Sequence, residues 1–244
     1  MLQLRRGSPG APVRPRNDPG QYDDLADQWW APRGEFAMLA WINAARARLV
    51  PPATHPGAVL LDVACGGGLL APYVAAKGYR HVGVDLSPTA AGTARVHGVE
   101  AVRGDALALP LADASADVVV AGELLEHVPD VERAIAEACR VLKPGGRLVL
   151  DTVADTWLAR FLVVTVGERL PAGPPPRLHD PALFVDRERL RQACARHGIP
   201  ALRLQGLRPG IPGYLLWLVR RRPDVPMVAT RVTAALFQAW GDKR

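Results

Sequence analysis

The stretch from Leu60 to Leu70 constrains the fold of this chain more than any other. It reads LLDVACGGGLL, in which a short aliphatic run passes into an acid, a glycine-rich segment and a new apolar period. This order is typical of a buried strand that turns tightly into a helix. Open α/β sheets bind ligands beyond the carboxyl ends of their strands, where glycines let a ligand approach the backbone N–H groups of a helix start. The stretch therefore predicts an α/β protein with a ligand at this turn.

The pattern after this turn alternates between strand-like and helix-like segments. Helices of this length between strands imply right-handed crossovers and a mostly parallel sheet. We predict a Rossmann-like, doubly wound α/β sheet of seven mostly parallel strands. The expected strands are 59–63, 81–85, 99–103, 117–121, 147–152, 201–207 and 232–240, and the expected helices are 69–77, 88–98, 130–142 and 186–197.

The chain is expected to form a single domain over residues 21–244, because its length and 49% hydrophobic content suit one core. Residues 1–20 contain four prolines among glycines and arginines, which predicts a disordered tail. Five aromatic residues in helical periods predict an N-terminal helical cap over residues 21–52. Residues 153–185 combine an apolar segment with a Pro/Gly-rich loop, and we expect a lid or insert there.

Charge and cysteine content narrow the partners. The formal net charge of +6 would permit anionic partners, but the arginines are dispersed and lack the interleaved aromatics of a nucleic-acid surface, so we expect no nucleic acid. Three scattered cysteines without CxxC spacing argue against a disulfide framework or a zinc site. The same cysteines suit a reducing compartment, so the sequence predicts a cytoplasmic protein. We expect no exported or membrane-spanning segment, because no apolar run reaches about 18 residues. The sequence leaves the oligomeric state open.

Two acids predict that the ligand contains a nucleoside. Asp85 ends the second strand about 20 residues after the glycine turn, where a carboxylate can accept both ribose hydroxyls. Asp105 follows the third strand and is suited to an adenine amino group. A dinucleotide-binding oxidoreductase would show GxGxxG, whereas Ala64, Gly66 and Leu69 occupy those positions. The pattern therefore favours one adenosine over a dinucleotide.

Several strings extend this pattern to a known family. The strings DQWWAPRGEF, INAAR, LLDVACGGGLLA, GELLEHVPD, VLKPGG and LHDPALFV lie within residues 22–207. In these the chain resembles class I S-adenosylmethionine-dependent methyltransferases and, more narrowly, the ubiquinone-biosynthesis O-methyltransferases. The resemblance implies S-adenosylmethionine (SAM) as cofactor. It also implies O-methylation of a phenolic, catechol or quinol hydroxyl on a small hydrophobic aromatic substrate, with or without a prenyl chain.

The resemblance also implies a set of cofactor contacts. Arg46 would pair with the methionine carboxylate, a task that suits a guanidinium fork. The family has glycine where this chain has Ala64, and because alanine excludes a positive φ, we expect a negative one there. The predicted cofactor-binding residues are Arg46, Asp62, Ala64, Cys65, Gly66, Asp85, Leu86, Asp105, Ala106 and Gly122.

Glu123, Glu126 and His127 follow the fourth strand and form the predicted catalytic group. In a helical turn, residues three and four positions apart share a face, so two carboxylates and an imidazole would converge. His127 could act as general base, or the three residues could bind a divalent metal such as magnesium that stabilises a phenolate. The alternative is that Glu123 only lines the cofactor pocket while the other two cap the next element. His179 and Asp180 either line the acceptor pocket or form a solvated pair.

Two apolar segments leave membrane contact open. Residues 157–166, with Arg160 and Arg169 nearby, and residues 213–222, which read GYLLWLVRRR, suit peripheral binding to the inner face of an anionic membrane. The first segment is equally typical of a core helix. For the activity, two alternatives remain: C-methylation of a similar small-molecule scaffold, and a non-catalytic binding subunit with a methyltransferase fold.

Overall fold

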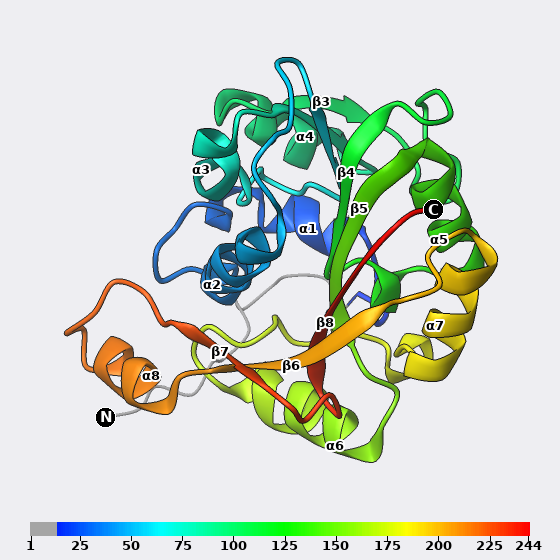
Figure 1. Ribbon diagram of the computed structural model, residues 1–244. Helices are drawn as coiled ribbons and strands as arrows, with labels where there is room; N and C mark the ends of the chain where they lie inside the picture. The colour runs from blue at the N-terminus through cyan, green and yellow to red at the C-terminus, as the bar shows by residue number, and fades with distance from the viewer. Residues whose placement is uncertain (1–13) are drawn as a thin grey trace.

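A computed structural model describes residues 14–244, and it contains one eight-stranded sheet with the order β3-β2-β1-β4-β5-β8-β6-β7 (Figure 1). Strands β3, β2, β1, β4 and β5 are parallel, and β8, β6 and β7 are each antiparallel to the preceding neighbour in this order. The strands are β1 Val59–Val63, β2 Arg80–Asp85, β3 Glu100–Arg103, β4 Ala116–Gly122, β5 Leu142–Val153, β6 Arg203–Pro209, β7 Met227–Thr230 and β8 Leu236–Asp242.

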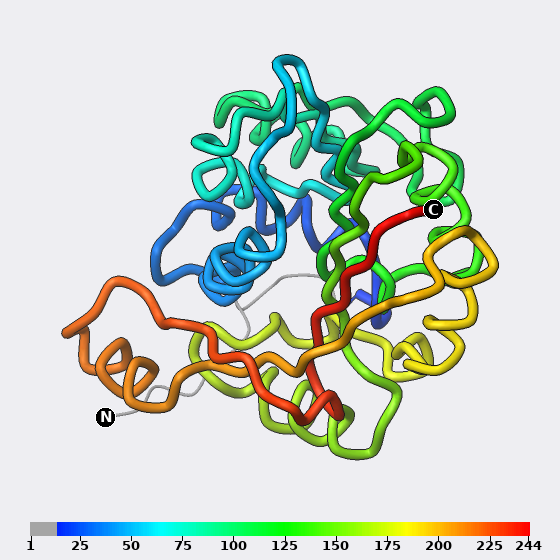
Figure 2. The backbone as a smooth tube through the Cα atoms, viewed as in Figure 1, coloured from blue at the N-terminus to red at the C-terminus, as the bar shows by residue number. Residues whose placement is uncertain are grey.

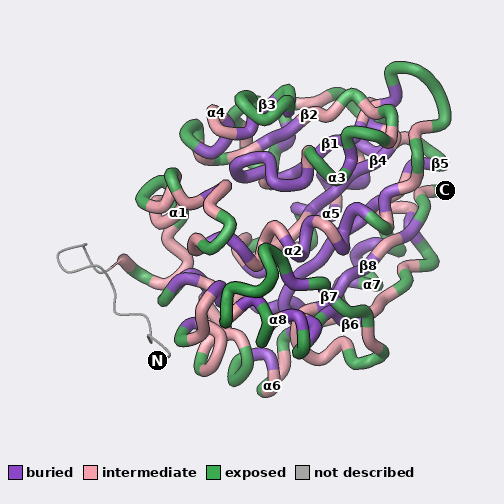
Figure 3. Tube along the Cα trace, turned by 90° about the vertical axis from the view of Figure 1, so that its left-hand side faces the viewer, coloured by how far each residue is buried: buried purple, intermediate pink, exposed green. Residues whose placement is uncertain are grey.

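Helices cover both faces of the sheet. Successive residues of a strand point to opposite faces of the sheet and form two cores. On one face, Leu60 and Val118 pack against α3 and against the residues that precede β1. On the other face, Leu61 and Val119 pack against α5 and α7. Figure 3 shows the central strands β1, β4, β5 and β8 as largely buried, whereas the edge strands β3 and β7 are more exposed. The helices are α1 Gly20–Asp24, α2 Ala37–Arg46, α3 Ala71–Val74, α4 Pro88–Val96, α5 Val131–Val141, α6 Trp157–Ala159, α7 Arg187–Arg196 and α8 Ile211–Leu218, and a π-helix covers Arg160–Val166.

The strand order reverses between β1 and β4, which are neighbours in the sheet although two strands separate them in sequence. In doubly wound sheets such a switch point opens a crevice at the carboxyl ends of the two strands. The glycine turn follows β1 at this point, and Glu123 follows β4. The topology thus brings together the two sequence motifs that we singled out.

The prediction of a Rossmann-like, mostly parallel sheet is confirmed, with one more strand than the seven expected. The additional strand is β7, a four-residue edge strand that pairs with β6 alone. Its short length gives too little period-two alternation to be recognised in the sequence. The predicted strand at 232–240 begins later, at Leu236, and runs to Asp242.

The N-terminal prediction differs from the structure in part. Residues 1–13 of the predicted disordered tail lie outside the described residues. Residues 14–19, which we call the N-terminal strap, contact the body: Arg16 pairs with Glu168 at 2.8 Å, and Arg14 pairs with Asp24 of α1 at 2.6 Å. Because the Arg16–Glu168 pair joins residues 152 positions apart, local composition does not reveal it.

The insert and α8 lie at one end of the sheet (Figure 2). The segment between β5 and α7 contains α6 and the π-helix, and the residues before β7 form α8. None of the helices within residues 14–244 has the length and apolar character needed to cross a membrane.

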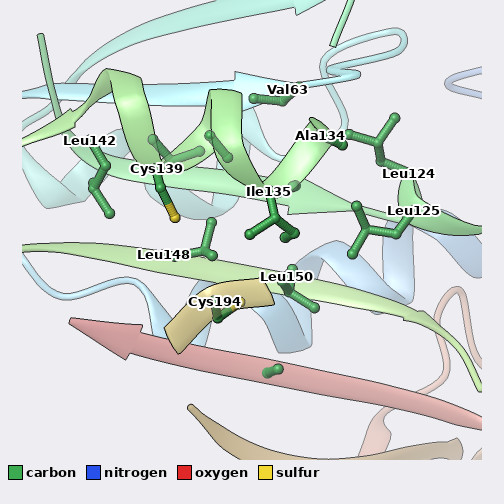
Figure 4. Close-up of a cluster of buried hydrophobic side chains, with 14 of the residues drawn as sticks. Val63, Leu124, Leu125, Ala134, Ile135, Cys139, Leu142, Leu148, Leu150 and Cys194 are labelled. Atoms are coloured by element: carbon green, nitrogen blue, oxygen red, sulfur yellow. The ribbon is translucent and has the colours of Figure 1, made fainter. Parts of the chain in front are cut away.

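The core between the sheet and α5 depends on Ile135, which is fully buried on α5 (Figure 4). Replacing Ile135 by alanine leaves a cavity and is expected to lower the free energy of unfolding by about 2–5 kcal/mol, measured by urea denaturation. Ile135→Val, which removes one methyl group, should cost about 0.5–1.5 kcal/mol. A loss below about 1 kcal/mol for the alanine variant would contradict this packing.

Candidate functional site

A cavity of about 730 Å³ lies at the carboxyl ends of the parallel strands. Its lining comes from the glycine turn, the ends of β2, β3 and β4, the N-terminal cap, the insert and α8. This volume lies within the range of small-molecule and cofactor sites. All ten predicted cofactor-binding residues line this cavity, and each of them lies in the cap, near the end of a strand or in the turn after one.

The cap closes directly onto the glycine turn. A Cβ atom at either Gly66 or Gly67 would lie 2.6 Å from the indole of Trp29, so side chains at these positions would displace the cap. Trp30 Nε1 also donates a hydrogen bond of 2.8 Å to the Gly67 carbonyl oxygen. The two glycines therefore serve the contact with the cap, in addition to any contact with a ligand.

Ala64 adopts a positive φ of 57°, and our expectation of a negative φ was wrong. This left-handed conformation costs an alanine roughly 1–2 kcal/mol. The next residues are fixed by β2, because Cys65 N donates to Val84 O at 3.1 Å and Gly66 N donates to Asp85 Oδ2 at 2.8 Å. These bonds to the neighbouring strand maintain the strained backbone.

Asp85 accepts backbone hydrogen bonds with both carboxylate oxygens, from Gly66 N at 2.8 Å and from Ser87 N at 2.9 Å. Burial raises the pKa of this carboxyl group, although the two N–H groups oppose the shift. Each oxygen keeps a second acceptor position, so the side chain can still accept from ribose hydroxyls. Asp105 accepts from Leu107 N at 2.8 Å and lines the same cavity, one strand further out.

Arg46 is buried and has a protein partner that the sequence did not reveal. Its Nε and Nη2 donate to the two carboxylate oxygens of Asp151 at 2.7 and 2.6 Å, and Nη1 donates to Asn43 Oδ1 at 2.6 Å. A guanidinium has five N–H donors, so these bonds leave two for a cofactor carboxylate. Asp151 lies near the end of β5. Its position at a strand end was the feature of the sequence from which this partner of Arg46 could have been predicted.

Gly122 is required by Arg46. A Cβ atom built at Gly122 would lie 1.8 Å from Arg46 Cζ, so the guanidinium occupies the space that any side chain there would fill. Gly122 also lines the cavity. The last residue of β4 therefore sets how close the guanidinium comes to the switch point.

Glu123 and Glu126 lie in different surroundings. Glu123 has a φ of 50° and its N–H donates to Asp151 O at 2.9 Å, which directs the residue toward the Arg46–Asp151 pair. Burial and the neighbouring carboxylates raise the pKa of Glu123 well above its usual range. Glu126 is fully buried and accepts from Thr152 Oγ1 at 2.6 Å, and burial raises its pKa as well.

His127 lies beside the cavity between two polar side chains. Its Nδ1 is 2.6 Å from Asn17 Oδ1, and its Nε2 is 3.2 Å from the Tyr22 hydroxyl. Burial lowers the pKa of His127 to about 4, so the imidazole is neutral at neutral pH. The ring of His179 stacks on it with a centroid distance of 5.0 Å, and burial lowers the pKa of His179 too.

Among the described residues, the potential metal ligands that converge are Glu126, His127 and His179, whose ligand atoms lie within 4.8 Å of one another. The predicted set had Glu123 in place of His179. The difference arises because Glu123 precedes the 3-10 turn Leu125–His127 with a positive φ and is not part of one helical face. Asp180 does not line the cavity; it caps the turn Pro181–Leu183 by accepting from Ala182 N at 3.0 Å.

Comparison with known proteins gives two groups of similar proteins. A family model described as a methyltransferase domain matches residues 61–150. The ubiquinone biosynthesis O-methyltransferase of Azoarcus sp. is 34% identical over 197 residues, covering 77% of this chain and 84% of that protein. The protein of the same name from Ralstonia nicotianae is 33% identical over 232 residues, covering 86% of this chain and 97% of that one.

Solved structures show the same fold at lower identity. A SAM-dependent methyltransferase from Thermotoga maritima has a TM-score of 0.62 at 22% identity and covers 92% of this chain and 97% of its own. The phosphoethanolamine N-methyltransferase 2 of Haemonchus contortus, solved in complex with SAM, has a TM-score of 0.60 at 17% identity and covers 91% of this chain and 59% of its own.

The contact between Gly122 and Arg46 yields a test of the cofactor site. Gly122→Ala displaces the guanidinium and is expected to weaken SAM binding at least about 10-fold, measured by isothermal titration calorimetry. Gly92→Ala is the matched control, because a Cβ atom there meets nothing within 4 Å and the residue lies inside α4. It should leave the affinity unchanged and stabilise the protein by about 0.5–1 kcal/mol. Unchanged affinity in Gly122→Ala would contradict a role for Arg46 in cofactor binding.

Proposed function

Because this chain belongs to the family of ubiquinone biosynthesis O-methyltransferases and is a SAM-dependent methyltransferase, we propose that it methylates a phenolic or catechol-type hydroxyl of a hydrophobic aromatic acceptor. The observation that carries the proposal is the cavity, which joins the cofactor residues to a largely apolar region next to His127. Apolar side chains from the cap, the insert and α8 line that region; among them are Leu39, Ile42, Leu162, Val166, Leu170 and Tyr214.

For SAM binding, the proposal assigns roles to Arg46 and to residues at the strand ends. Asp85 would accept the ribose hydroxyls, Asp105 would face the adenine, and the two remaining N–H groups of Arg46 would bind the methionine carboxylate. The turn from Asp62 to Gly66 would lie against the methionine portion of SAM. This arrangement would direct the sulfonium methyl group from the switch point toward the apolar part of the cavity.

The chemical step would be a direct displacement. A lone pair of the acceptor oxygen forms the new O–C bond while the C–S bond breaks, so the sulfonium becomes the neutral thioether of S-adenosylhomocysteine. The hydroxyl proton must leave the oxygen, and the neutral imidazole of His127 is placed to receive it. The lining of the cavity is mostly apolar, which would reduce the amount of water around the reacting methyl group.

The proposal also includes a divalent cation bound beside the acceptor. Glu126 Oε1 and His179 Nδ1 are buried and have no hydrogen-bond partner among the described residues. Both atoms belong to side chains that can ligate a metal ion, so the site fits one. Glu126, His127 and His179 would hold it as an alternative to base catalysis, because the Nε2 lone pair of His127 cannot bind a metal ion and accept a proton at once. When bound, the ion would act as a Lewis acid that lowers the pKa of the acceptor hydroxyl. Two imidazoles and one carboxylate suit a softer divalent ion better than magnesium.

The acceptor assay combines purified protein, labelled SAM and catechols with and without a prenyl chain. We expect methyl transfer to oxygen, and we expect His127→Asn to lower kcat by about 10²- to 10⁴-fold while SAM binding persists. A chelator should reduce turnover, and a zinc or manganese salt should restore it. SAM binding without transfer to any phenol would overturn O-methylation, and full turnover after metal removal would overturn the metal role alone.

We further propose that the protein contacts an anionic membrane surface beside the cavity. Trp157 is 76% exposed on α6 and Ile211 is 62% exposed on α8, and the three consecutive arginines 220–222 follow α8. Leu162 and Ile211 are exposed and also line the cavity. A hydrophobic acceptor dissolved in a membrane could therefore enter without crossing water.

Co-sedimentation with anionic vesicles tests this contact. The double variant Trp157→Ser with Phe161→Ser is expected to bind vesicles with 30% phosphatidylglycerol about 10-fold more weakly than the wild type at low salt, because two aromatic groups no longer insert. Val96→Ser is the control, since Val96 is 82% exposed on α4 and does not line the cavity. Equal binding of the double variant and the wild type would contradict the proposal.

A further inference from the structure

The ring of His127 is oriented by the N-terminal strap. Asn17 contacts this histidine twice: its Nδ2 donates to the His127 carbonyl oxygen at 2.9 Å, and its Oδ1 lies 2.6 Å from His127 Nδ1. One amide thus contacts both the backbone and the side chain of the same residue. The two residues are 110 positions apart in sequence, so this contact exists only when the strap is in place.

These two contacts determine which ring nitrogen carries the proton. A carbonyl oxygen can only accept, so the amide nitrogen of Asn17 must face it, and the amide oxygen must then face the ring. That oxygen can also only accept, so His127 Nδ1 must be the donor. In the neutral ring Nε2 is then the acceptor, which agrees with the Tyr22 hydroxyl 3.2 Å away.

We propose that Asn17 is a positioning residue that selects the Nδ1–H tautomer of His127 and so presents the Nε2 lone pair to the cavity. Tyr22, which lines the cavity and is half-buried, donates to that lone pair when the acceptor is absent. An entering hydroxyl group replaces the tyrosine as the donor. This use of Nε2 rests on the proposed function, whereas the choice of tautomer does not.

The strap is positioned for this role by its other contacts. Arg16 pairs with Glu168 at 2.8 Å and donates to the His179 carbonyl oxygen at 2.8 Å, and Asn17 N donates to Arg177 O at 3.1 Å. The strap therefore joins the insert to His127 and passes beside both stacked imidazoles. Asn17 itself has a φ of 58°, a region that asparagine, aspartate and glycine tolerate better than other residues.

This conformation determines which variants give a clean test. Asn17→Gly deletes the amide without backbone strain, whereas alanine would add strain at the same φ. Asn17→Asp keeps an acceptor opposite Nδ1 and also tolerates the conformation. Tyr22→Phe removes the donor to Nε2 and keeps the aromatic ring that stacks on Trp29. Arg16 and its contacts remain in all three variants.

The tautomer is read directly from long-range ¹H–¹⁵N correlation spectra of histidine-labelled protein. We expect the Nδ1–H form of His127 in the wild type, in Asn17→Asp and in Tyr22→Phe, and a shift toward the Nε2–H form in Asn17→Gly. An Nε2–H tautomer in the wild type would overturn the proposal, as would an unchanged tautomer in Asn17→Gly. Thermal unfolding of each variant confirms that the spectra describe folded protein.

Kinetics test the consequence for the reaction. If Asn17 presents Nε2, Asn17→Gly should lower kcat for methyl transfer about 10- to 100-fold with the KM for SAM unchanged. A shifted tautomer with unchanged kcat would overturn the presentation of Nε2. If the wild type transfers no methyl group to any phenol, the proposed function fails while the tautomer spectra still decide the role of Asn17.

Discussion

The buried ion pair between Arg46 and Asp151 is the interaction on which the site depends. It joins α2 of the cap to β5 of the sheet, and neither side chain is more than 5% exposed. A buried pair stabilises little relative to apolar packing, but leaving one partner alone costs about 3–5 kcal/mol. Each side chain therefore constrains the other, and the cap cannot move away from the sheet without exposing or isolating a charge.

Hydrogen bonds to neighbouring strands hold the backbone on both sides of the switch point. Glu123 follows β4 with a positive φ, and its N–H donates to the carbonyl oxygen of Asp151 itself. Ala64 follows β1 with a positive φ, and the residues after it bond to the end of β2. In each case a neighbouring strand stabilises a conformation that a non-glycine residue adopts at a cost. Strain of this kind at two adjacent strand ends is typical of a site whose geometry is set in advance.

Local pattern in the sequence was enough to predict the sheet and the acids at its edge. Strand and helix periods indicated the parallel sheet, and the spacing of acids after strands placed Asp85 and Asp105 at one cavity. The pattern missed β7, which has four residues, and the partners of Arg46 and His127, which lie 105 and 110 positions away. It also placed Glu123 in a metal set that assumed one continuous helical face, whereas the positive φ of Glu123 breaks that face. Contacts between distant segments leave no periodic signal in a single sequence.

The cavity has two halves that are held in place by different kinds of contact. The half that would hold SAM is built on strand ends, whose positions are determined by the hydrogen-bonded register of the sheet. The half beside His127 is built by the strap, the insert and α8, which reach one another through side-chain contacts such as Arg16–Glu168 and Tyr214–Pro171. Connecting segments tolerate sequence change better than a sheet does. The half beside His127 can therefore change its shape while the register of the sheet keeps the strand ends of the other half in place.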